Sequence, residues 1–109
     1  MKEVARFPRS RLEEEELVRL THPPFDIVVA LVDGVPFALE DSCNHAGASL
    51  AEGFLKAERL VCPLHGYVFD IRTGELLAPK GLCDAQRRYE VTIEGDEVVV
   101  WDEFKLTIF

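Results

Sequence analysis

The chain has 109 residues, the length of one domain, and 48% of them are hydrophobic, which suits a folded protein with one modest core. Its formal net charge of −8 argues against binding to nucleic acid, which needs basic patches, and against binding to anionic membranes. The first residues lack the apolar segment of a signal peptide, and the longest apolar run, residues 27–32, cannot span a bilayer. We therefore expect a soluble, cytoplasmic protein.

The first half of the chain contains several short β-type segments. They lie at residues 3–7, 17–20, 26–32 and 35–40, and the last two flank Asp33-Gly34, which is a strong hairpin signal. Residues 9–17 are the one helix candidate, with one or two polar turns. The four glutamates at 13–16 are expected to form a solvated face, although a docking surface for a partner stays open.

The second half continues the β pattern. Strands are predicted at residues 58–62 and 67–71, with a turn at 72–74, and at 89–93 and 97–101 around a turn at 94–96. The alternation of Tyr89, Val91 and Ile93 turns one face of the first of the last two strands inward. The chain is thus predicted to be all-β, a small antiparallel sandwich or barrel of eight to ten short strands.

Two similar loops interrupt the middle of this pattern. The segments SCNHAG (residues 42–47) and VCPLHG (residues 61–66) each hold one cysteine and one histidine and each end on glycine. The whole chain has only three cysteines and three histidines, so chance placement as buried thiols or surface residues is a poor explanation. Two thiolates and two imidazoles form a complete ligand set for a metal centre: Cys43, His45, Cys62 and His65.

The residues alone leave the metal open. Structural zinc sites commonly take a close pair of cysteines from one segment and a close pair of histidines from another, whereas each loop here offers one of each. Such mixed loops can reach a single ion. They match a two-iron cluster better, because each loop can then supply one ligand to each iron.

The arrangement Cys-x-His, a gap of sixteen residues, and Cys-Pro-x-His-Gly resembles the Rieske iron–sulfur proteins, in which two histidines replace two cysteines on one iron. The resemblance extends over residues 37–53, 62–75 and 89–100. It implies one [2Fe-2S] cluster per chain, with Cys43 and Cys62 on one iron and His45 and His65 on the other. It also implies that residues 1–109 form a single Rieske domain, with a cluster-binding subdomain at about 41–72.

The ligand set and its surroundings predict the reduction potential. A cluster with two histidines is neutral when oxidised and carries one negative charge when reduced, so it accepts an electron more readily than a four-cysteine cluster. The high-potential branch of the family has a disulfide between the loops, but this chain has Ala48 and Leu64 at those positions. That branch also has serine and tyrosine hydroxyls where Tyr67 and Phe69 stand here. The loss of these donors to sulfur predicts a potential at the low end of the range, about −150 mV.

Backbone N–H groups are the expected remaining donors to the cluster sulfurs. The resemblance places them near Ala46, Gly47, Gly66 and Tyr67, next to the ligands in both loops.

The resemblance implies a one-electron carrier rather than an enzyme. Its expected partners are a flavin-dependent NAD(P)H reductase and a terminal oxygenase or other redox enzyme, and a monomer is expected. Two alternatives stay open, the small subunit of an assimilatory NADH-dependent nitrite reductase and a zinc-stabilised interaction module.

The remaining chemically active residues are expected to be structural. His22 and Cys83 lie outside the motif and are predicted to be loop residues. Asp70 and Arg72 are predicted to pin the turn after the second loop, and Trp101 to lie in the core or on the sheet surface.

Overall fold

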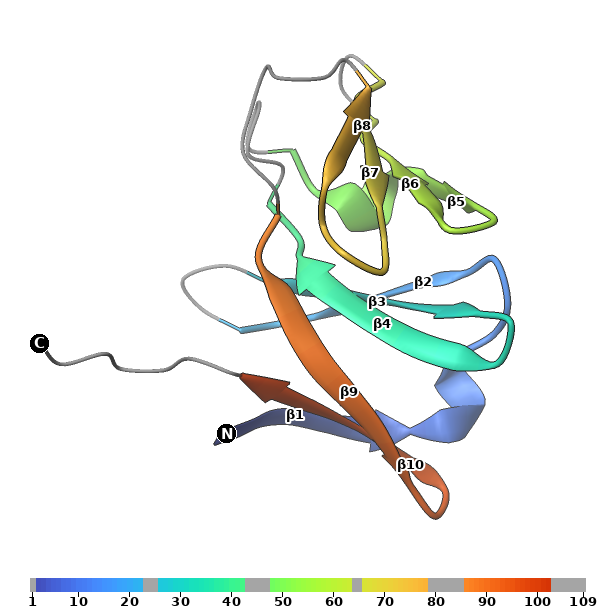
Figure 1. The fold of residues 1–109 in the computed structure, drawn as a ribbon. Helices are drawn as coiled ribbons and strands as arrows, with labels where there is room; N and C mark the ends of the chain where they lie inside the picture. The colour runs from blue at the N-terminus through green and yellow to red at the C-terminus, as the bar shows by residue number, and fades with distance from the viewer. Residues whose placement is uncertain (1, 23–25, 43–47, 64–65, 79–85, 103–109) are drawn as a thin grey trace, which may run out of the picture.

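The computed structural model describes residues 2–22, 26–42, 48–63, 66–78 and 86–102 (Figure 1). In these residues the chain is built from antiparallel strands and two short 3-10 turns, which confirms the predicted all-β class. None of the helical segments in the described ranges has the length and apolar character needed to cross a membrane. In chain order the elements are β1 (Lys2–Pro8), η1 (Arg9–Arg11), β2 (Leu17–Leu20), β3 (Ile27–Val32), β4 (Val35–Glu40), η2 (Leu50–Glu52), β5 (Phe54–Lys56), β6 (Arg59–Val61), β7 (Val68–Asp70), β8 (Leu76–Ala78), β9 (Arg88–Glu94) and β10 (Glu97–Asp102).

The strands form two sheets. Six strands pair in the order β1-β10-β9-β4-β3-β2, and four pair in the order β5-β6-β7-β8. The chain leaves the larger sheet after β4, forms the smaller sheet, and returns as β9 directly beside β4, where Ala38 pairs with Tyr89 (Figure 1). The four-stranded sheet is therefore an insertion between two neighbouring strands of the larger sheet. Both predicted ligand loops belong to this insertion.

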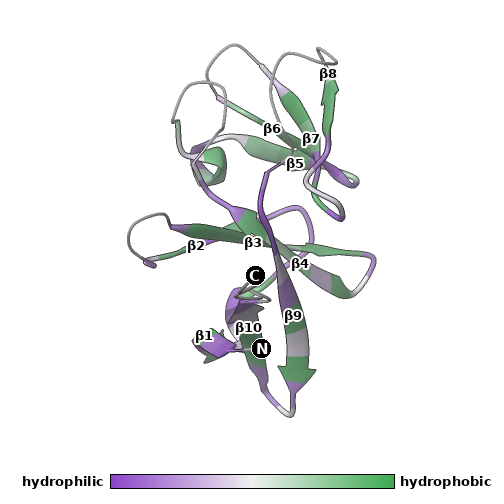
Figure 2. Ribbon diagram, turned by 60° about the vertical axis from the view of Figure 1, so that its left-hand side comes forward, coloured by the Kyte–Doolittle hydropathy of each residue, from purple (hydrophilic) through white to green (hydrophobic). Residues whose placement is uncertain are grey.

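Strand β3 is buried on both faces and joins two hydrophobic cores. Val28 and Ala30 face the smaller sheet, where they share a core with Leu60 and Phe69. Val29 lies in a second core, enclosed by the curled larger sheet, together with residues of β9 and β10. Burial on both faces explains why β3 is a continuous apolar run rather than an alternating one. Figure 2 shows apolar residues on strands of both sheets.

The β3–β4 hairpin turns as predicted. Asp33 and Gly34 both have positive φ, 51° and 79°, which matches the right-handed twist of the flanking strands. The carboxylate of Glu14 accepts hydrogen bonds from the backbone N–H groups of both turn residues, at 2.8 Å and 3.2 Å.

The predicted helical segment over residues 9–17 is wrong in its second half. Only the 3-10 turn Arg9–Arg11 forms, and β2 already begins at Leu17. Glu15 has a φ of 64°, which ends any right-handed helix, and Glu14 instead bridges to Leu31 of β3. The acidic run is exposed as predicted, but one of its members holds a turn in place.

Two strands have no counterpart among the segments predicted from the sequence. β5 and β8 contain three residues each, too few for a periodic signal. The turn between β5 and β6 contains no glycine, and Ala57 adopts the left-handed conformation there with a φ of 55°. Because β8 pairs with β7, the smaller sheet continues to Ala78. It therefore extends past residue 72, near which the predicted cluster-binding subdomain ends.

Candidate metal centre

The second ligand segment forms the connection between the paired strands β6 and β7 of the smaller sheet. Cys62 comes immediately after β6 and is 1% exposed. Its backbone N–H donates to the carbonyl oxygen of Tyr67 at 2.7 Å, so residues 62–67 form a closed loop. His65 lies inside this loop but outside the described residues. The closure holds the two ends of the segment that carries both predicted ligands.

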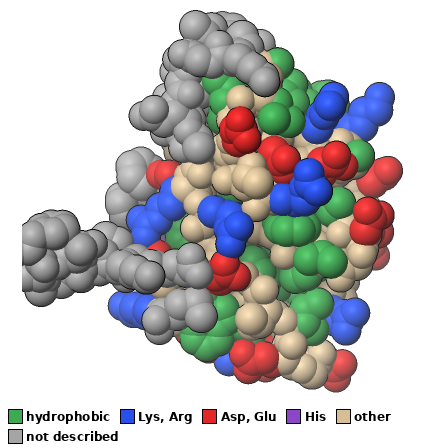
Figure 3. Space-filling model, in the orientation of Figure 1, with side chains coloured by type: hydrophobic (Ala, Val, Ile, Leu, Met, Phe, Trp, Pro, Cys, Tyr) green, Lys and Arg blue, Asp and Glu red, His purple; other side chains and the backbone are tan. Residues whose placement is uncertain are grey.

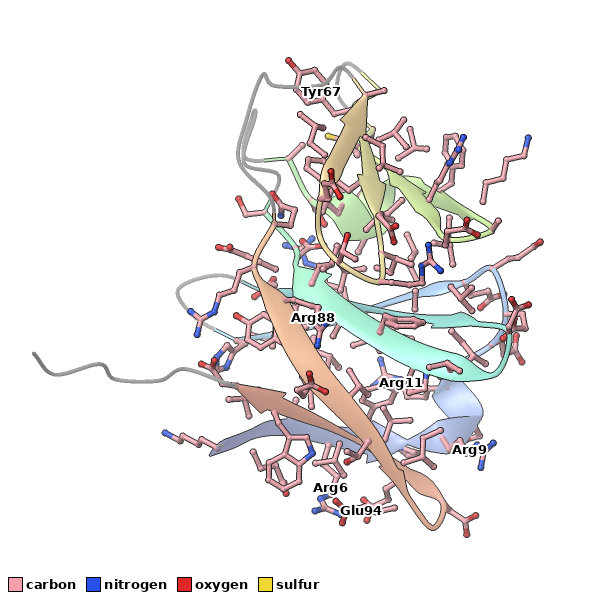
Figure 4. The ribbon with its side chains drawn as sticks, viewed as in Figure 1. Arg6, Arg9, Arg11, Tyr67, Arg88 and Glu94 are labelled. Carbon is pink, nitrogen blue, oxygen red and sulfur yellow. The ribbon has the colours of Figure 1, made fainter. Side chains whose placement is uncertain are left out.

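The exposed side of this loop leaves room for a bulky group. Pro63 and Gly66 are exposed, and Gly66 has a φ of 67°, a conformation that favours glycine. A Cβ built on Gly66 would meet no atom within 4 Å. Tyr67 is half-buried and lies at the end of the molecule opposite Arg6 and Glu94 (Figure 4).

The first ligand segment is described at both of its ends. Cys43, His45, Ala46 and Gly47 lie outside the described residues. Ser42 and Ser49, on either side of them, form an antiparallel bridge. The chain therefore enters and leaves this segment at one point, as it does in the second segment.

A buried carboxylate fastens this point. Asp41 is 2% exposed, and its oxygens accept hydrogen bonds from the Ser49 hydroxyl at 2.6 Å and from the backbone N–H of Ala51 at 2.8 Å. Its backbone carbonyl accepts from the N–H of Leu50 at 2.8 Å. These bonds tie the residue before the first ligand segment to residues 49–51, shortly after it.

An ion pair supports Asp41 from the larger sheet. Arg19 of β2 places its Nε 3.5 Å from an Asp41 oxygen and donates to Asp26 at 2.9 Å. The pKa of Asp26 lies below its usual value, first because the backbone N–H of His22 donates to it and then because Arg19 does. The pKa of Arg19 is raised, mainly by the bond to Asp26 and next by the charge of Asp41.

His22 is structural in its described contacts, as predicted. Besides the bond from its backbone to Asp26, its ring meets the ring of Tyr89 edge-on at 6.3 Å. Cys83, the other residue set aside from the ligand set, lies outside the described residues.

A buried glutamine connects the start of the first ligand segment with the turn after β7. Gln86 is 3% exposed, and its Nε2 donates to the carbonyl oxygens of Glu40 at 2.8 Å and Ser42 at 2.7 Å. Its backbone N–H donates to the carbonyl oxygen of Gly74 at 2.7 Å. Gly74 belongs to the turn after β7, and β7 follows the second ligand segment, so Gln86 connects the start of the first segment with the far end of β7.

The turn after β7 is pinned as predicted. The backbone N–H of Arg72 donates to the carboxylate of Asp70 at 2.8 Å, and the two side chains form an ion pair at 3.3 Å. This bond is the main reason why the pKa of Arg72 is raised. The N–H of Gly74 closes the turn on the Asp70 carbonyl at 2.7 Å.

Two positions at which the chain differs from the high-potential branch lie at the core between the two sheets. Phe69, which stands where the high-potential branch has a hydroxyl, is fully buried in the core between the two sheets. Ala48, which replaces a disulfide cysteine, packs against the same core.

The described part of the site fits an iron–sulfur cluster. A buried cysteine thiol is the kind of ligand that such clusters require. The two closed loops and the open space beside Gly66 provide the backbone approach that a bulky inorganic group needs.

Comparisons with known proteins place the chain in a family. The model of the Rieske [2Fe-2S] domain matches residues 3–83. The ferredoxin component of biphenyl 2,3-dioxygenase from Rhodococcus jostii (strain RHA1) is 39% identical over 85 residues, which are 78% of each chain.

Solved structures agree in fold. The ferredoxin of carbazole 1,9a-dioxygenase from Nocardioides aromaticivorans IC177 superposes with a TM-score of 0.83 and 27% identity, covering 94% of this chain and all of that one. A chain in the complex of reduced oxygenase and oxidised ferredoxin of carbazole 1,9a-dioxygenase gives 0.78 and 30% identity, with coverage of 85% and 95%.

The chain therefore belongs to the Rieske [2Fe-2S] family. It is a Rieske-type ferredoxin, an electron carrier rather than an enzyme, and its cofactor is one [2Fe-2S] cluster.

Sequence reasoning assigned no role to Asp41 or Gln86. Asp41 stands two positions before the first ligand cysteine, and Gln86 is the only glutamine of the chain. Neither position has a pattern that reveals its partners, because those partners are mostly backbone groups brought close by the fold.

Proposed function

We propose that this chain receives electrons from a flavin-dependent NAD(P)H reductase and delivers them, one at a time, to a terminal oxygenase. The observation that supports these partners is the similarity to ferredoxin components of dioxygenases, including a chain in a complex of an oxygenase with its ferredoxin. We also propose that the carrier acts as a monomer in the cytoplasm.

The proposed ligands are Cys43 and Cys62 on one iron and His45 and His65 on the other, within a cluster-binding subdomain at about 41–72 of a single domain. Bound there, the cluster supplies a one-electron redox couple. The chain contributes a buried thiol at Cys62 and two loops closed at their bases. Backbone N–H groups near Ala46, Gly47, Gly66 and Tyr67 are the proposed donors to sulfur. They set the potential together with the absence of a hydroxyl at Phe69.

Charged side chains of both signs share the surface. Figure 3 shows acidic and basic side chains interspersed on the face drawn there. On this face the excess of acidic residues does not form a single patch of one sign.

The low end of the Rieske range, about −150 mV, is the potential expected for the bound cluster.

The first test is purification without added metal, followed by iron and sulfide assays and by absorption and EPR spectra before and after dithionite. Two irons and two sulfides per chain, with a reduced-state signal of mixed histidine and cysteine ligation, are expected. A colourless protein that contains zinc would contradict the proposal and favour a structural module.

The ligand assignment is tested with matched substitutions. Cys62→Ser is expected to abolish the cluster, whereas Cys83→Ser is expected to keep it. His45→Cys adds a negative charge and lowers the potential of any cluster that assembles, whereas His22→Cys leaves it unchanged. An assembled His45→Cys protein with an unchanged or higher potential would refute the assignment.

Delivery to partners is tested by mixing the reduced protein with a purified terminal oxygenase of the dioxygenase type. Reoxidation that depends on the oxygenase and its substrate is expected. If only a sirohaem nitrite reductase reoxidises the protein, the alternative role as its subunit is correct instead.

A further inference from the structure

Gln86 lies where the inserted sheet, with its ligand segments, meets the larger sheet. It lies two residues before β9, on the chain that returns from the inserted sheet, and it is 3% exposed. Asp41 is the other buried polar or charged side chain among the described residues, and both lie next to the first ligand segment. Burying a polar side chain costs free energy unless its hydrogen bonds are made, so these two positions carry a specific arrangement of partners.

The side-chain amide of Gln86 bonds to the residues on both sides of Asp41. A primary amide has two N–H hydrogens, and Nε2 donates to two carbonyls, those of Glu40 and Ser42. These carbonyls flank Asp41, whose own oxygens accept bonds from Ser49 and Ala51. Gln86 thereby fixes the backbone up to the residue that directly precedes the predicted ligand Cys43.

The backbone of Gln86 reaches the turn after β7, the strand that follows the second ligand segment. Its N–H bonds to the Gly74 carbonyl, and the two chains approach so closely that a Cβ on Gly74 would lie 2.3 Å from the Gln86 carbonyl oxygen. Gly74 is bonded in turn to Asp70 at the end of β7, and β7 starts one residue after Tyr67. One residue therefore links the base of the first segment to the strand that carries the second.

We propose that Gln86 is a positioning residue for the cluster, which sets the spacing of the two ligand segments through its side-chain amide. The proposal rests on the proposed function, since it assumes a cluster bound by both segments. The potential and spectroscopic signature of such a cluster depend on ligand geometry and on hydrogen bonds to its sulfurs. A change in the spacing of the segments must therefore alter these properties in the folded protein.

The test compares Gln86→Met and Gln86→Glu with Val98→Ala in the cluster-loaded protein. Methionine keeps the length of the side chain but removes both donors, and glutamate places a carboxylate oxygen against two carbonyl oxygens. Val98 is fully buried in the core of the larger sheet, so Val98→Ala lowers global stability without touching the junction. The readouts are the midpoint potential, the EPR g-values of the reduced protein and the rate of cluster release to a chelator.

Both Gln86 variants are expected to shift the potential and the g-values, and Gln86→Met to release the cluster about tenfold faster than wild type. Gln86→Glu is expected to release it faster still. Val98→Ala is expected to keep the potential and the g-values of the wild type while unfolding at lower denaturant. Gln86→Met with wild-type potential, g-values and release rate would overturn the proposal, as would equal shifts in Val98→Ala.

A second variant covers the case in which neither Gln86 variant folds. Ser49→Ala removes the hydroxyl that bonds to Asp41 at the same loop base, and the same shifts in potential and g-values are expected, with a smaller size. Unchanged values in Ser49→Ala would then refute the positioning role of this junction. A wild-type protein without iron and sulfide would refute the proposed function itself, so the two failures are distinguishable.

Discussion

The two sheets of this ferredoxin are held together in different ways. Strands of the larger sheet contain four to seven residues, whereas each strand of the smaller sheet contains three. One hydrophobic core lies between the two sheets and the other is enclosed by the larger sheet, so burial of apolar side chains supports both sheets. What differs is the place of the polar interactions.

On the larger sheet the polar side chains interact at the surface. Arg6 of β1 pairs with Glu3 and Glu97, and all three side chains are exposed by more than a third. The bond from Arg6 lowers the pKa of Glu3. Exposed pairs of this kind are screened by solvent and contribute little to stability.

At the base of the smaller sheet the polar side chains are buried. Asp41 and Gln86 bond mainly to backbone groups of the chain that enters and leaves the ligand segments. Short strands have few ladder hydrogen bonds with which to fix a loop, so buried side-chain bonds supply the missing constraint. The larger sheet therefore acts as a stable base, whereas the geometry of the cluster site depends on a few polar residues where the two sheets meet.

Two signals can report the two regions separately. Trp101, the only tryptophan, lies in β10 of the larger sheet and donates to Thr92 at 2.9 Å. Its fluorescence follows the base, and the visible absorption of the cluster follows the inserted sheet.

Gly74→Ala should have the largest effect. The residue has a φ of 81°, and the added Cβ would lie 2.3 Å from the Gln86 carbonyl oxygen. Left-handed strain and this clash together predict a loss of about 4 kcal/mol. We expect the cluster absorption to disappear at much lower urea than in wild type, ahead of the change in Trp101 fluorescence.

Gly95→Ala is the matched control for Gly74→Ala. Gly95 also has positive φ, 62°, but a Cβ there would meet no atom within 4 Å. Only the strain is left, at about 1 kcal/mol, and the cluster absorption should follow the tryptophan signal. Equal effects of the two substitutions would show that the close approach to Gln86 has no consequence.

Leu60→Ala should have the next largest effect. Leu60 is fully buried in the core between the sheets, and its truncation predicts a loss of about 3 kcal/mol. Because this core supports the inserted sheet, the cluster absorption is expected to be lost before Trp101 fluorescence changes in a urea titration.

Val98→Ala, in the core of the larger sheet, is expected to move both transitions together, since the inserted sheet depends on its base. If Leu60→Ala also moves both signals together, the two regions unfold as one unit and the comparison between them fails.

Much of the base could be predicted from the sequence. The β3–β4 hairpin was predicted to within one residue because its apolar strands flank an Asp-Gly turn, which has a well-defined backbone conformation. The β9–β10 hairpin could be predicted equally well, because apolar and polar residues alternate along β9 and the two strands flank a turn at Gly95. These are local signals, in which neighbours in the sequence are neighbours in the fold.

The inserted sheet was harder to predict from the sequence, because it has few such local signals. Its three-residue strands β5 and β8 carry no period, and the left-handed Ala57 turn has no glycine to mark it. The motif predicts a ligand set, but the hydrogen bonds of Asp41 and Gln86 join residues up to 46 positions apart. Such contacts exist only once the chain has folded.

Glu14→Ala should have a smaller effect, at the border between the two regions. The carboxylate accepts two backbone N–H groups of the β3–β4 turn, and it lines a surface hollow together with Lys56 of the inserted sheet. Loss of these exposed hydrogen bonds predicts about 1 kcal/mol of destabilisation, read from the midpoint of Trp101 fluorescence in urea.

Glu13→Ala is the control, because it removes the same charge from the same exposed run. A change of less than a third of that caused by Glu14→Ala is expected. Comparable losses would mean that the net charge of the run matters, rather than the capping of the turn.

Tyr89→Phe should have the smallest effect and should show it only in alkali. Tyr89 is 5% exposed in the core of the larger sheet, and this burial raises the pKa of its hydroxyl above the usual value of 10.0, while Arg87 partly opposes the shift. The folded state thus holds the phenolic proton more tightly than the unfolded state does. This contribution to stability is complete below about pH 10 and is lost as the pH rises through the folded-state pKa.

In Tyr89→Phe there is no proton to lose, so the urea midpoint of Trp101 fluorescence should fall less steeply above about pH 10 than in wild type. At pH 8 the phenol of Tyr89 keeps its proton in the folded and the unfolded state, so any difference there measures the hydroxyl itself. Identical slopes in the two proteins would show that another group causes the alkaline loss. Because Tyr89 belongs to the core of the base, cluster absorption should change only when the base unfolds, which places this sensitivity in the larger sheet rather than at the cluster site.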